Sequence, residues 1–181
     1  MDLEGLLKEK RADILDRWLR MILDTYPPDA ARIFALGKDP FANPLGDTIR
    51  RATSDIFDAI VDGAEPDRLT AAVDELVKIR AIQSFKPSEA LACLFFLKKV
   101  VRDVGKDNGD APDFERFDTK VDHMVLLGFE AYVNSREKIA NIRVAETRRA
   151  LGKLLERAEI AVGVPGLQSE TKDNVEVEAN T

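Results

Sequence analysis

The chain carries one histidine, His123, and one cysteine, Cys93, the side chains that most often bind a metal ion or a haem iron. On a helix, His123 shares its polar face with Glu130 and Glu137, whereas a haem or metal ligand points into a pocket with supporting polar groups. A metal site made from one histidine and one cysteine on different helices would also be unusual. We therefore expect a solvated His123 and no haem or metal cofactor.

The sequence contains no recognisable set of catalytic residues. Cys93 lies in the apolar run from Ala90 to Leu97, where a free cysteine usually packs as a small hydrophobic side chain. A single histidine leaves no room for a Ser-His-Asp triad beside other roles, and neither a Walker loop nor a Gly-x-Gly-x-x-Gly motif occurs. The many carboxylates fall on solvated helical faces. The sequence predicts that the protein is not an enzyme.

Composition and charge argue against two classes of partner. The 181 residues are 45% hydrophobic and 33% charged, a balance typical of a globular chain. The net charge of -6 argues against nucleic acid, because neutralising phosphates requires a basic surface. The longest apolar run has eight residues, and a bilayer span needs roughly 20, so no membrane insertion is expected. Without a recognisable secretory signal, we expect a cytoplasmic protein.

Prolines mark where helices begin. Pro44, Pro66, Pro87 and Pro112 each open an apolar periodic stretch, and the first turn of a helix tolerates proline because its N–H would lack a partner there. We find no useful strand pattern and expect an all-α bundle of about five to six helices with a long C-terminal helix. Residues 1–162 would form one domain, and residues 163–181 a disordered acidic tail. The predicted helices are 2–25, 44–62, 66–82, 87–104 and 112–160, with a short helical turn near 29–36.

Two segments of the N-terminal half carry aromatic residues that we expect in the core. Trp18 continues an apolar face of the first predicted helix that also contains Leu7, Ile14 and Ile22. Phe41 lies in a loop rich in turn residues, and we expect its ring to plug into the core.

The junction between two predicted helices, residues 78–88, is the most distinctive stretch of the chain. It places Arg80, Gln83 and Ser84 at a helix end. We expect these side chains to cap the helix and to form hydrogen bonds at the junction. Contact with a small ligand or a protein partner is the alternative.

The last predicted helix has two apolar faces. The first stripe can pack on the core of the chain itself, and the second, about 120° round the helix, needs another partner. Either the helix breaks near 134–142 and folds back, or the second stripe pairs with a second copy of the chain in a coiled-coil-like contact. We expect the second, a homodimer. The first stripe contains Phe114, Phe117, Val121, Val125, Gly128, Tyr132 and Ile139, and the second contains Leu126, Phe129, Val133, Ala140, Val144, Leu151, Leu155, Ala158 and Val162.

Four segments together resemble the N-terminal domain of RsbRD-type RsbT co-antagonist proteins. They are residues 18–27, 39–44, 79–90 with 97–98, and 129–132 with 136–137, and they span about residues 10–150. The resemblance implies a globin-like helical sensor module of bacterial stressosomes that is generally haem-free and dimeric. In that family the module precedes a STAS domain and signals to it through the last helix. Here an acidic stretch follows Val162, so we expect a free-standing copy without a STAS domain, for which binding of the RsbT kinase is not implied.

The function that follows is that of a non-enzymatic sensor or regulatory domain for signal transduction in a stress response. We expect it to act by protein–protein interaction, as a homodimer with an unidentified regulatory partner. The resemblance supplies no catalytic residues. The alternative function is a small-molecule carrier or sensor that holds haem or an apolar ligand in the helical core.

Overall fold

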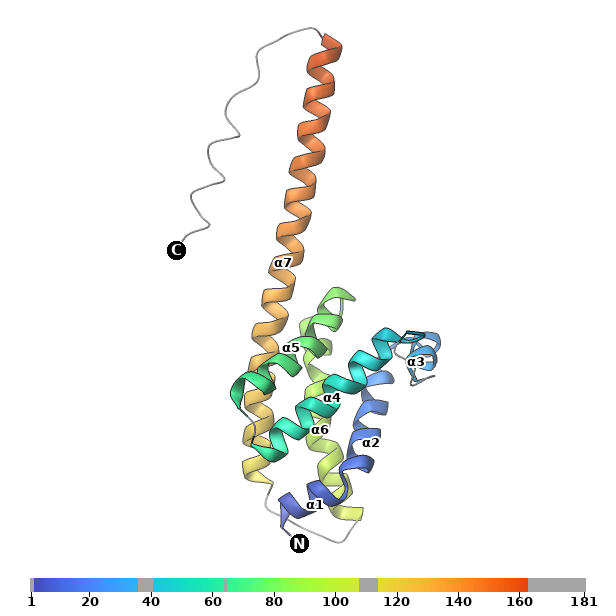
Figure 1. The fold of residues 1–181 in the computed structure, drawn as a ribbon, viewed down its shortest axis with the longest axis vertical. Helices are drawn as coiled ribbons and strands as arrows, with labels where there is room; N and C mark the ends of the chain where they lie inside the picture. The colour runs from blue at the N-terminus through green and yellow to red at the C-terminus, as the bar shows by residue number, and fades with distance from the viewer. Residues whose placement is uncertain (1, 36–40, 64, 108–113, 163–181) are drawn as a thin grey trace. The chain divides into compact units, whose positions relative to one another are not determined.

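The computed structural model describes residues 2–35, 41–63, 65–107 and 114–162. Within these ranges there are seven α-helices and no strand (Figure 1). The prediction of an all-α fold with a long C-terminal helix is therefore confirmed, while the predicted tail at 163–181 lies outside the described residues. The helices are α1 (Leu3–Glu9), α2 (Arg11–Leu23), α3 (Pro28–Ala35), α4 (Pro44–Asp62), α5 (Pro66–Ile82), α6 (Pro87–Asp107) and α7 (Glu115–Val162).

Local sequence explains where several helices begin and end. Helices α4, α5 and α6 each start at the proline that predicts them. Asn43 caps α4, because its Oδ1 accepts a hydrogen bond from the backbone N–H of Gly46 at 3.0 Å. The same helix ends at Gly63, whose left-handed φ of 65° suits a residue without a Cβ. The fourth predicted start, Pro112, lies outside the described residues, and α7 is described from Glu115.

The prediction of one continuous first helix over residues 2–25 is wrong. The segment forms two helices, and Lys10 between them has φ -96° and ψ 13°, away from the helical values. The change of direction lets α1 bury Leu6 together with Leu7, although Leu6 does not belong to the predicted apolar face. The physical reason is that burying both leucines stabilises the chain more than continuing one straight amphipathic face.

Trp18 is at the centre of the core, as predicted. Its side chain is 0% exposed, and Ile14 and Ile22 on the same face of α2 are equally buried. The indole Nε1 donates a hydrogen bond to the backbone carbonyl oxygen of Cys93 in α6 at 2.7 Å. A buried indole N–H needs such an acceptor, so this bond fixes the orientation of the ring between α2 and α6.

The prediction that Phe41 plugs into the core is wrong. Its side chain is 97% exposed. The buried anchor of this loop is Asn43, whose Nδ2 donates hydrogen bonds to the carbonyl oxygens of Phe34 at 2.9 Å and Ile33 at 3.1 Å. The loop is therefore held by a polar side chain that also caps α4, and it needs no aromatic plug.

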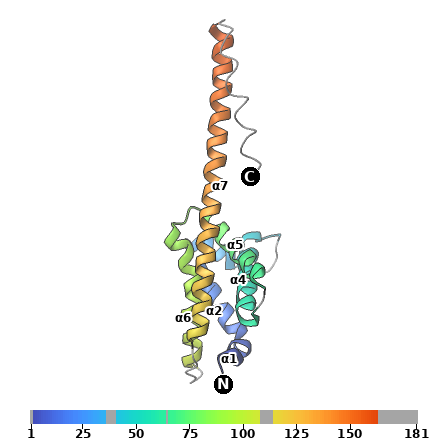
Figure 2. The ribbon, with the colours of Figure 1, turned by 90° about the vertical axis from the view of Figure 1, so that its left-hand side faces the viewer.

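The N-terminal part of α7 runs beside α6 (Figure 2). At the contact, a Cβ added to Gly128 would lie 2.7 Å from Leu94 Cδ1 and 3.1 Å from Leu91 Cδ2, so the absence of a side chain permits the close approach. Farther along the two helices, Lys98 Nζ donates to Asp122 at 2.7 Å. The first stripe of α7 packs here, because Phe117, Val121, Gly128 and Tyr132 are buried.

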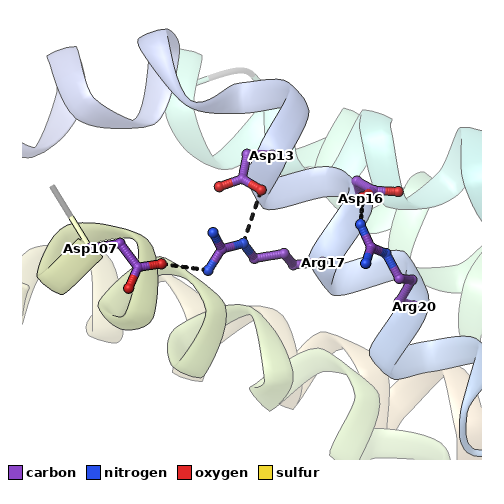
Figure 3. A network of polar contacts seen from close by, with 5 residues as sticks. All are labelled: Asp13, Asp16, Arg17, Arg20 and Asp107. Carbon is purple, nitrogen blue, oxygen red and sulfur yellow. Dashed lines mark hydrogen bonds and ion pairs between the residues drawn. The ribbon is translucent and has the colours of Figure 1, made fainter.

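Exposed ion pairs join the polar sides of α2 and α6 (Figure 3). Arg17 Nη1 donates to Asp107 at 2.7 Å, and its Nε donates to Asp13 at 2.9 Å. Arg20 pairs with Asp16 along α2. Ion pairs as exposed as these contribute little to stability. The contact between α2 and α6 therefore depends on buried apolar side chains, among them Trp18.

The chain divides into two compact units, residues 1–139 and residues 140–181. The first unit contains α1 to α6, the start of α7 and the core. In the second unit, the described side chains of α7, at 140–158, are exposed except at Gly152. Helix α7 is assigned as one helix through Val162, so the alternative with a break near 134–142 is wrong. None of the described helices is long and apolar enough to cross a membrane.

Candidate functional site

His123 and Cys93 have the surroundings that the sequence predicts. The His123 side chain on α7 is exposed. Cys93 is fully buried in α6, its thiol donates to the carbonyl oxygen of Ala90 at 3.1 Å, and burial raises the pKa of the thiol to about 11. A thiol with so high a pKa is almost entirely protonated near neutral pH and is a poor nucleophile. The described residues also contain no cluster of three or more His, Cys, Asp or Glu side chains able to hold a metal ion.

The predicted junction residues lie together at the turn from α5 to α6, but they do not all act as expected. Backbone groups close the helix end: the N–H of Gln83 donates to the Ile79 carbonyl oxygen at 3.1 Å, and that of Phe85 donates to the Arg80 carbonyl oxygen at 3.2 Å. The side chains of Gln83 and Ser84 are exposed. Ser84 has a φ of 64°, a left-handed conformation that is costly for a residue with a Cβ.

Arg80 differs from its two neighbours because its side chain is 0% exposed. The guanidinium lies 4.0 Å from the ring centre of Phe85 and 5.4 Å from that of Tyr26. Its Nη2 donates to Thr25 Oγ1 and to the Glu89 carbonyl oxygen, each at 3.1 Å. Its Nε and Nη1 atoms make no hydrogen bond of good geometry, although the Tyr26 hydroxyl lies near enough to interact with the guanidinium. A buried positive charge with unused donors is costly, because burial removes the water that would solvate it.

A groove of about 360 Å³ opens beside this buried cation. Tyr26 packs edge-on against Phe34 and Phe85, with ring centres 5.1 and 5.2 Å apart. The Tyr26 hydroxyl is buried without a hydrogen bond of good geometry; burial raises its pKa, and the nearby charge of Arg80 partly opposes that rise. The walls of the groove come from α3, from the residues just before it, and from the α5–α6 turn with the start of α6: Tyr26, Pro27, Ala30, Phe34, Gln83, Ser84, Phe85 and Glu89.

Two side chains of α7 bond directly to the backbone of the junction. The Tyr132 hydroxyl donates to the Phe85 carbonyl oxygen at 2.7 Å. Arg136 Nη1 donates to the Ala81 carbonyl oxygen at 3.4 Å, a long contact. Phe85 therefore lines the groove and also accepts, through its carbonyl oxygen, a hydrogen bond from α7.

In the first unit, the second stripe of α7 adjoins an exposed aromatic residue of α6. Leu126 and Phe129 are 65% and 52% exposed, and Val133 is half-buried. On α6, Phe95 is 45% exposed. Lys98, whose Nζ lies 5.8 Å from the centre of the Phe95 ring, binds Asp122 one turn before Leu126. We call these apolar residues the bundle patch: Phe95, Leu126, Phe129 and Val133.

In the second unit, α7 carries apolar side chains that contact no described part of the chain closely enough to be buried. We call four of them the C-terminal stripe: Val144, Leu151, Leu154 and Leu155, all about half exposed or more. Val144 and Leu151 are seven residues apart, and Leu154 follows after three, a spacing typical of helices that pair.

Sequence reasoning missed several residues of these sites. Leu154 has the i+3 spacing from Leu151 that could have placed it on the same face. Phe95 carries no such signal, because the first half of α6 is apolar nearly all round. The groove beside Tyr26 brings together segments that are distant in the sequence, and the Tyr26-Pro27 pair by itself indicates no more than a helix end.

Comparison with known proteins gives one match. The family model described as the RsbT co-antagonist protein rsbRD N-terminal domain matches residues 12–151, which is well over half of the chain. None of the curated proteins and none of the solved structures matches.

Proposed function

Because the chain belongs to the RsbRD N-terminal domain family, a family of regulatory domains in stress signalling, we propose that it works as a homodimeric, haem-free, globin-like sensor domain. On this proposal it performs no catalysis and acts in the cytoplasm by contact with a regulatory protein. The bundle patch is the dimer interface, and α7 carries the signal.

The exposed apolar surface of α7 is the observation that carries the proposal. Leu126 and Phe129 would remain in water in an isolated chain, and so would the apolar side chains of the C-terminal stripe. Within each unit, these side chains recur along one face of α7, and monomeric proteins rarely leave such an apolar face uncovered.

A second copy of the chain is the occupant that these surfaces favour. A two-fold contact presents the same patch from both partners, so an apolar surface meets an apolar surface without any further sequence requirement. The exposed carboxylates of Glu130 and Glu137 border the patch on α7 and remain at its solvated rim. The C-terminal stripe, taken separately, has the spacing of a short coiled-coil seam and can pair in the same dimer.

The junction supplies a route for the signal within the first unit. Tyr132 holds the Phe85 carbonyl oxygen at 2.7 Å, and Tyr132 follows the bundle-patch residue Phe129 by one helical turn. A shift of the α5–α6 turn therefore displaces the part of α7 that carries the interface. Coupling of this kind needs no catalytic residue, which agrees with the buried, protonated Cys93 thiol.

The alternative function is a small-molecule carrier or sensor of haem or an apolar ligand, and its haem-binding form has no observation in its favour among the described residues. The one histidine of the chain is exposed on the polar side of α7, where its imidazole does not point into the core. Titration with haemin tests this part of the proposal. A Soret shift at one equivalent of haemin that disappears in His123→Ala would contradict it.

Charge reversal at the interface tests the dimer. Val133→Glu and, separately, Phe129→Glu would bury an unpaired carboxylate between the two copies. We expect each variant to raise the dissociation constant of the dimer by at least about a hundredfold. The matched control is Asn134→Glu, which adds the same charge at an exposed neighbouring position. Light scattering after gel filtration reads the mass of each variant. Equal dimerisation of all three variants would exclude the bundle patch as the interface.

A further inference from the structure

We propose that the groove beside Arg80 binds a small monocarboxylate ligand, whose carboxylate bonds the buried guanidinium and whose apolar body lies against Tyr26, Phe34 and Phe85. The proposal names a ligand for the sensor role above and rests on that role only for the effect on α7. The binding site itself is independent of the dimer.

The unused donors of Arg80 carry the inference. Nη2 is saturated by Thr25 Oγ1 and the Glu89 carbonyl oxygen, whereas Nε–H and the N–H groups of Nη1 make no hydrogen bond of good geometry, and the Tyr26 hydroxyl near the guanidinium is poorly aligned. No carboxylate of the described residues bonds this fully buried side chain. Most buried arginines are paired with an anion, because a guanidinium alone is poorly stabilised away from water. A ligand carboxylate would supply both the acceptor and the charge.

The groove has the composition of a ligand site. Its volume of about 360 Å³ is at the small end of the usual range for pockets that hold small molecules. Three aromatic rings, with Pro27 and Ala30, provide apolar walls. The buried Tyr26 hydroxyl, which makes no hydrogen bond of good geometry, offers a further polar contact at the inner end.

Ser84 lies at the rim of the same groove. Its left-handed backbone, with φ 64°, closes the C-terminal end of α5, because the Phe85 N–H donates to the Arg80 carbonyl oxygen across it. The exposed hydroxyl of Ser84 and the amide of Gln83 can bond a polar group of the ligand that faces solvent.

Glu89 limits the charge of the ligand. Its carboxylate lies on the groove wall, and its Oε2 accepts a hydrogen bond from the Lys86 backbone N–H at 3.1 Å. A second negative group on the ligand would be repelled by this carboxylate. The site therefore favours one carboxylate on an apolar body over a phosphate or a dicarboxylate.

The ring of Phe85 lies between the groove and the guanidinium. It lines the groove and stacks 4.0 Å from the guanidinium, and Arg80 has no exposed surface of its own. Entry of a carboxylate therefore requires the ring to rotate aside. Because the Phe85 carbonyl oxygen accepts the hydrogen bond of Tyr132, ligand entry acts on the segment that contacts α7.

Phenylacetate is the probe for the binding site, with phenylacetamide as its uncharged match. We expect phenylacetate to raise the melting temperature of the wild-type chain and to shift NMR signals of the α5–α6 turn, because a ligand bound to the native state stabilises it. Phenylacetamide and phosphate should do neither. No response to phenylacetate up to about 10 mM, or an equal response to the amide, would overturn the proposal.

Three variants locate the site. Arg80→Met removes the charge at similar length and should abolish the response to phenylacetate, whereas Arg17→Met removes an exposed guanidinium and should leave it unchanged. Ala30→Trp fills the groove without touching Arg80 and should also abolish the response. Should Arg80→Met not fold, Ala30→Trp decides: a full response to phenylacetate in that folded variant contradicts binding in the groove.

The same samples separate this inference from the proposed function. A monomeric wild type that binds phenylacetate would refute the dimeric sensor and leave the carboxylate site standing. A dimer that gives no response to phenylacetate would refute the site and leave the dimer standing.

Discussion

The apolar face of α2 and the second stripe of α7 follow the same helical spacing but have different surroundings. Trp18 on α2 is 0% exposed and bonds the Cys93 carbonyl oxygen of α6, while Leu126 on α7 is 65% exposed. Periodicity indicates that a face will be buried, and it does not indicate by what. The face of α2 is buried within one chain, whereas that of α7 remains exposed there and, on the proposal above, is covered by a second copy.

Removing the tryptophan should have the largest effect on the free energy of unfolding and so tests the burial of the α2 face. We expect Trp18→Ala to lower the free energy of unfolding by about 3–5 kcal/mol, because it leaves a cavity in the core and removes the hydrogen bond to the Cys93 carbonyl oxygen. The control is Phe41→Ala, which should change that free energy by less than about 0.5 kcal/mol because Phe41 is exposed. Chemical denaturation measures both variants. Similar losses in the two would mean that the burial pattern described above is incorrect.

A smaller effect is expected at the polar edge of α2, where Arg11 donates to both carboxylate oxygens of Asp58 in α4 at 2.7 and 2.6 Å. The hydrogen bond with Arg11 holds the pKa of Asp58 below its usual value. A carboxyl with a lowered pKa stabilises the fold above its unfolded pKa, and this contribution is lost as the pH falls through the folded pKa. Asp58→Asn should therefore cost about 0.5 kcal/mol at neutral pH, discounted for partial exposure, and less in acid.

Urea denaturation of the wild type and Asp58→Asn across the acid range measures that contribution. We expect the two free energies of unfolding to converge as the pH falls. A gap that stays constant with pH would show that the variant acts through packing and not through the charge of Asp58.

The smallest effect is expected from Leu151→Ala, which distinguishes the stability of the single chain from that of the dimer. In the Val133→Glu background, where we expect a monomer, Leu151→Ala should change the free energy of unfolding by less than about 0.5 kcal/mol. In the wild-type background the same change should lower the melting temperature in a concentration-dependent way, because folding and association are linked. A large loss in the monomeric background would mean that Leu151 packs within its own chain.

Helix positions and the core of α2 could be predicted from sequence because they depend on local signals. Prolines at first turns and apolar residues every three or four positions are properties of short segments. The break at Lys10 and the exposure of Phe41 could not be predicted in this way. The break depends on which direction of α1 buries more apolar surface. The exposure of Phe41 depends on whether Asn43 or Phe41 anchors the loop.

The site at the junction was predictable only in part. Arg80, Gln83 and Ser84 are correctly placed at a helix end. Arg80 follows Leu76 and Val77 by four and three residues, a spacing that places it on the buried face of α5 and that could have distinguished it from Gln83 and Ser84. The contact of Arg80 with Thr25, which lies 55 residues away in the sequence, could not be predicted from that spacing. Contacts of that range follow from the fold rather than from local periodicity.

The association state of the wild-type chain tests the central claim most directly. Sedimentation equilibrium over a range of micromolar concentrations should give a mass of twice 20.2 kDa, because the apolar surface of α7 is covered by a second copy. A mass of 20.2 kDa over the whole range would contradict the account and would leave the exposed side chains of α7 without the partner proposed for them.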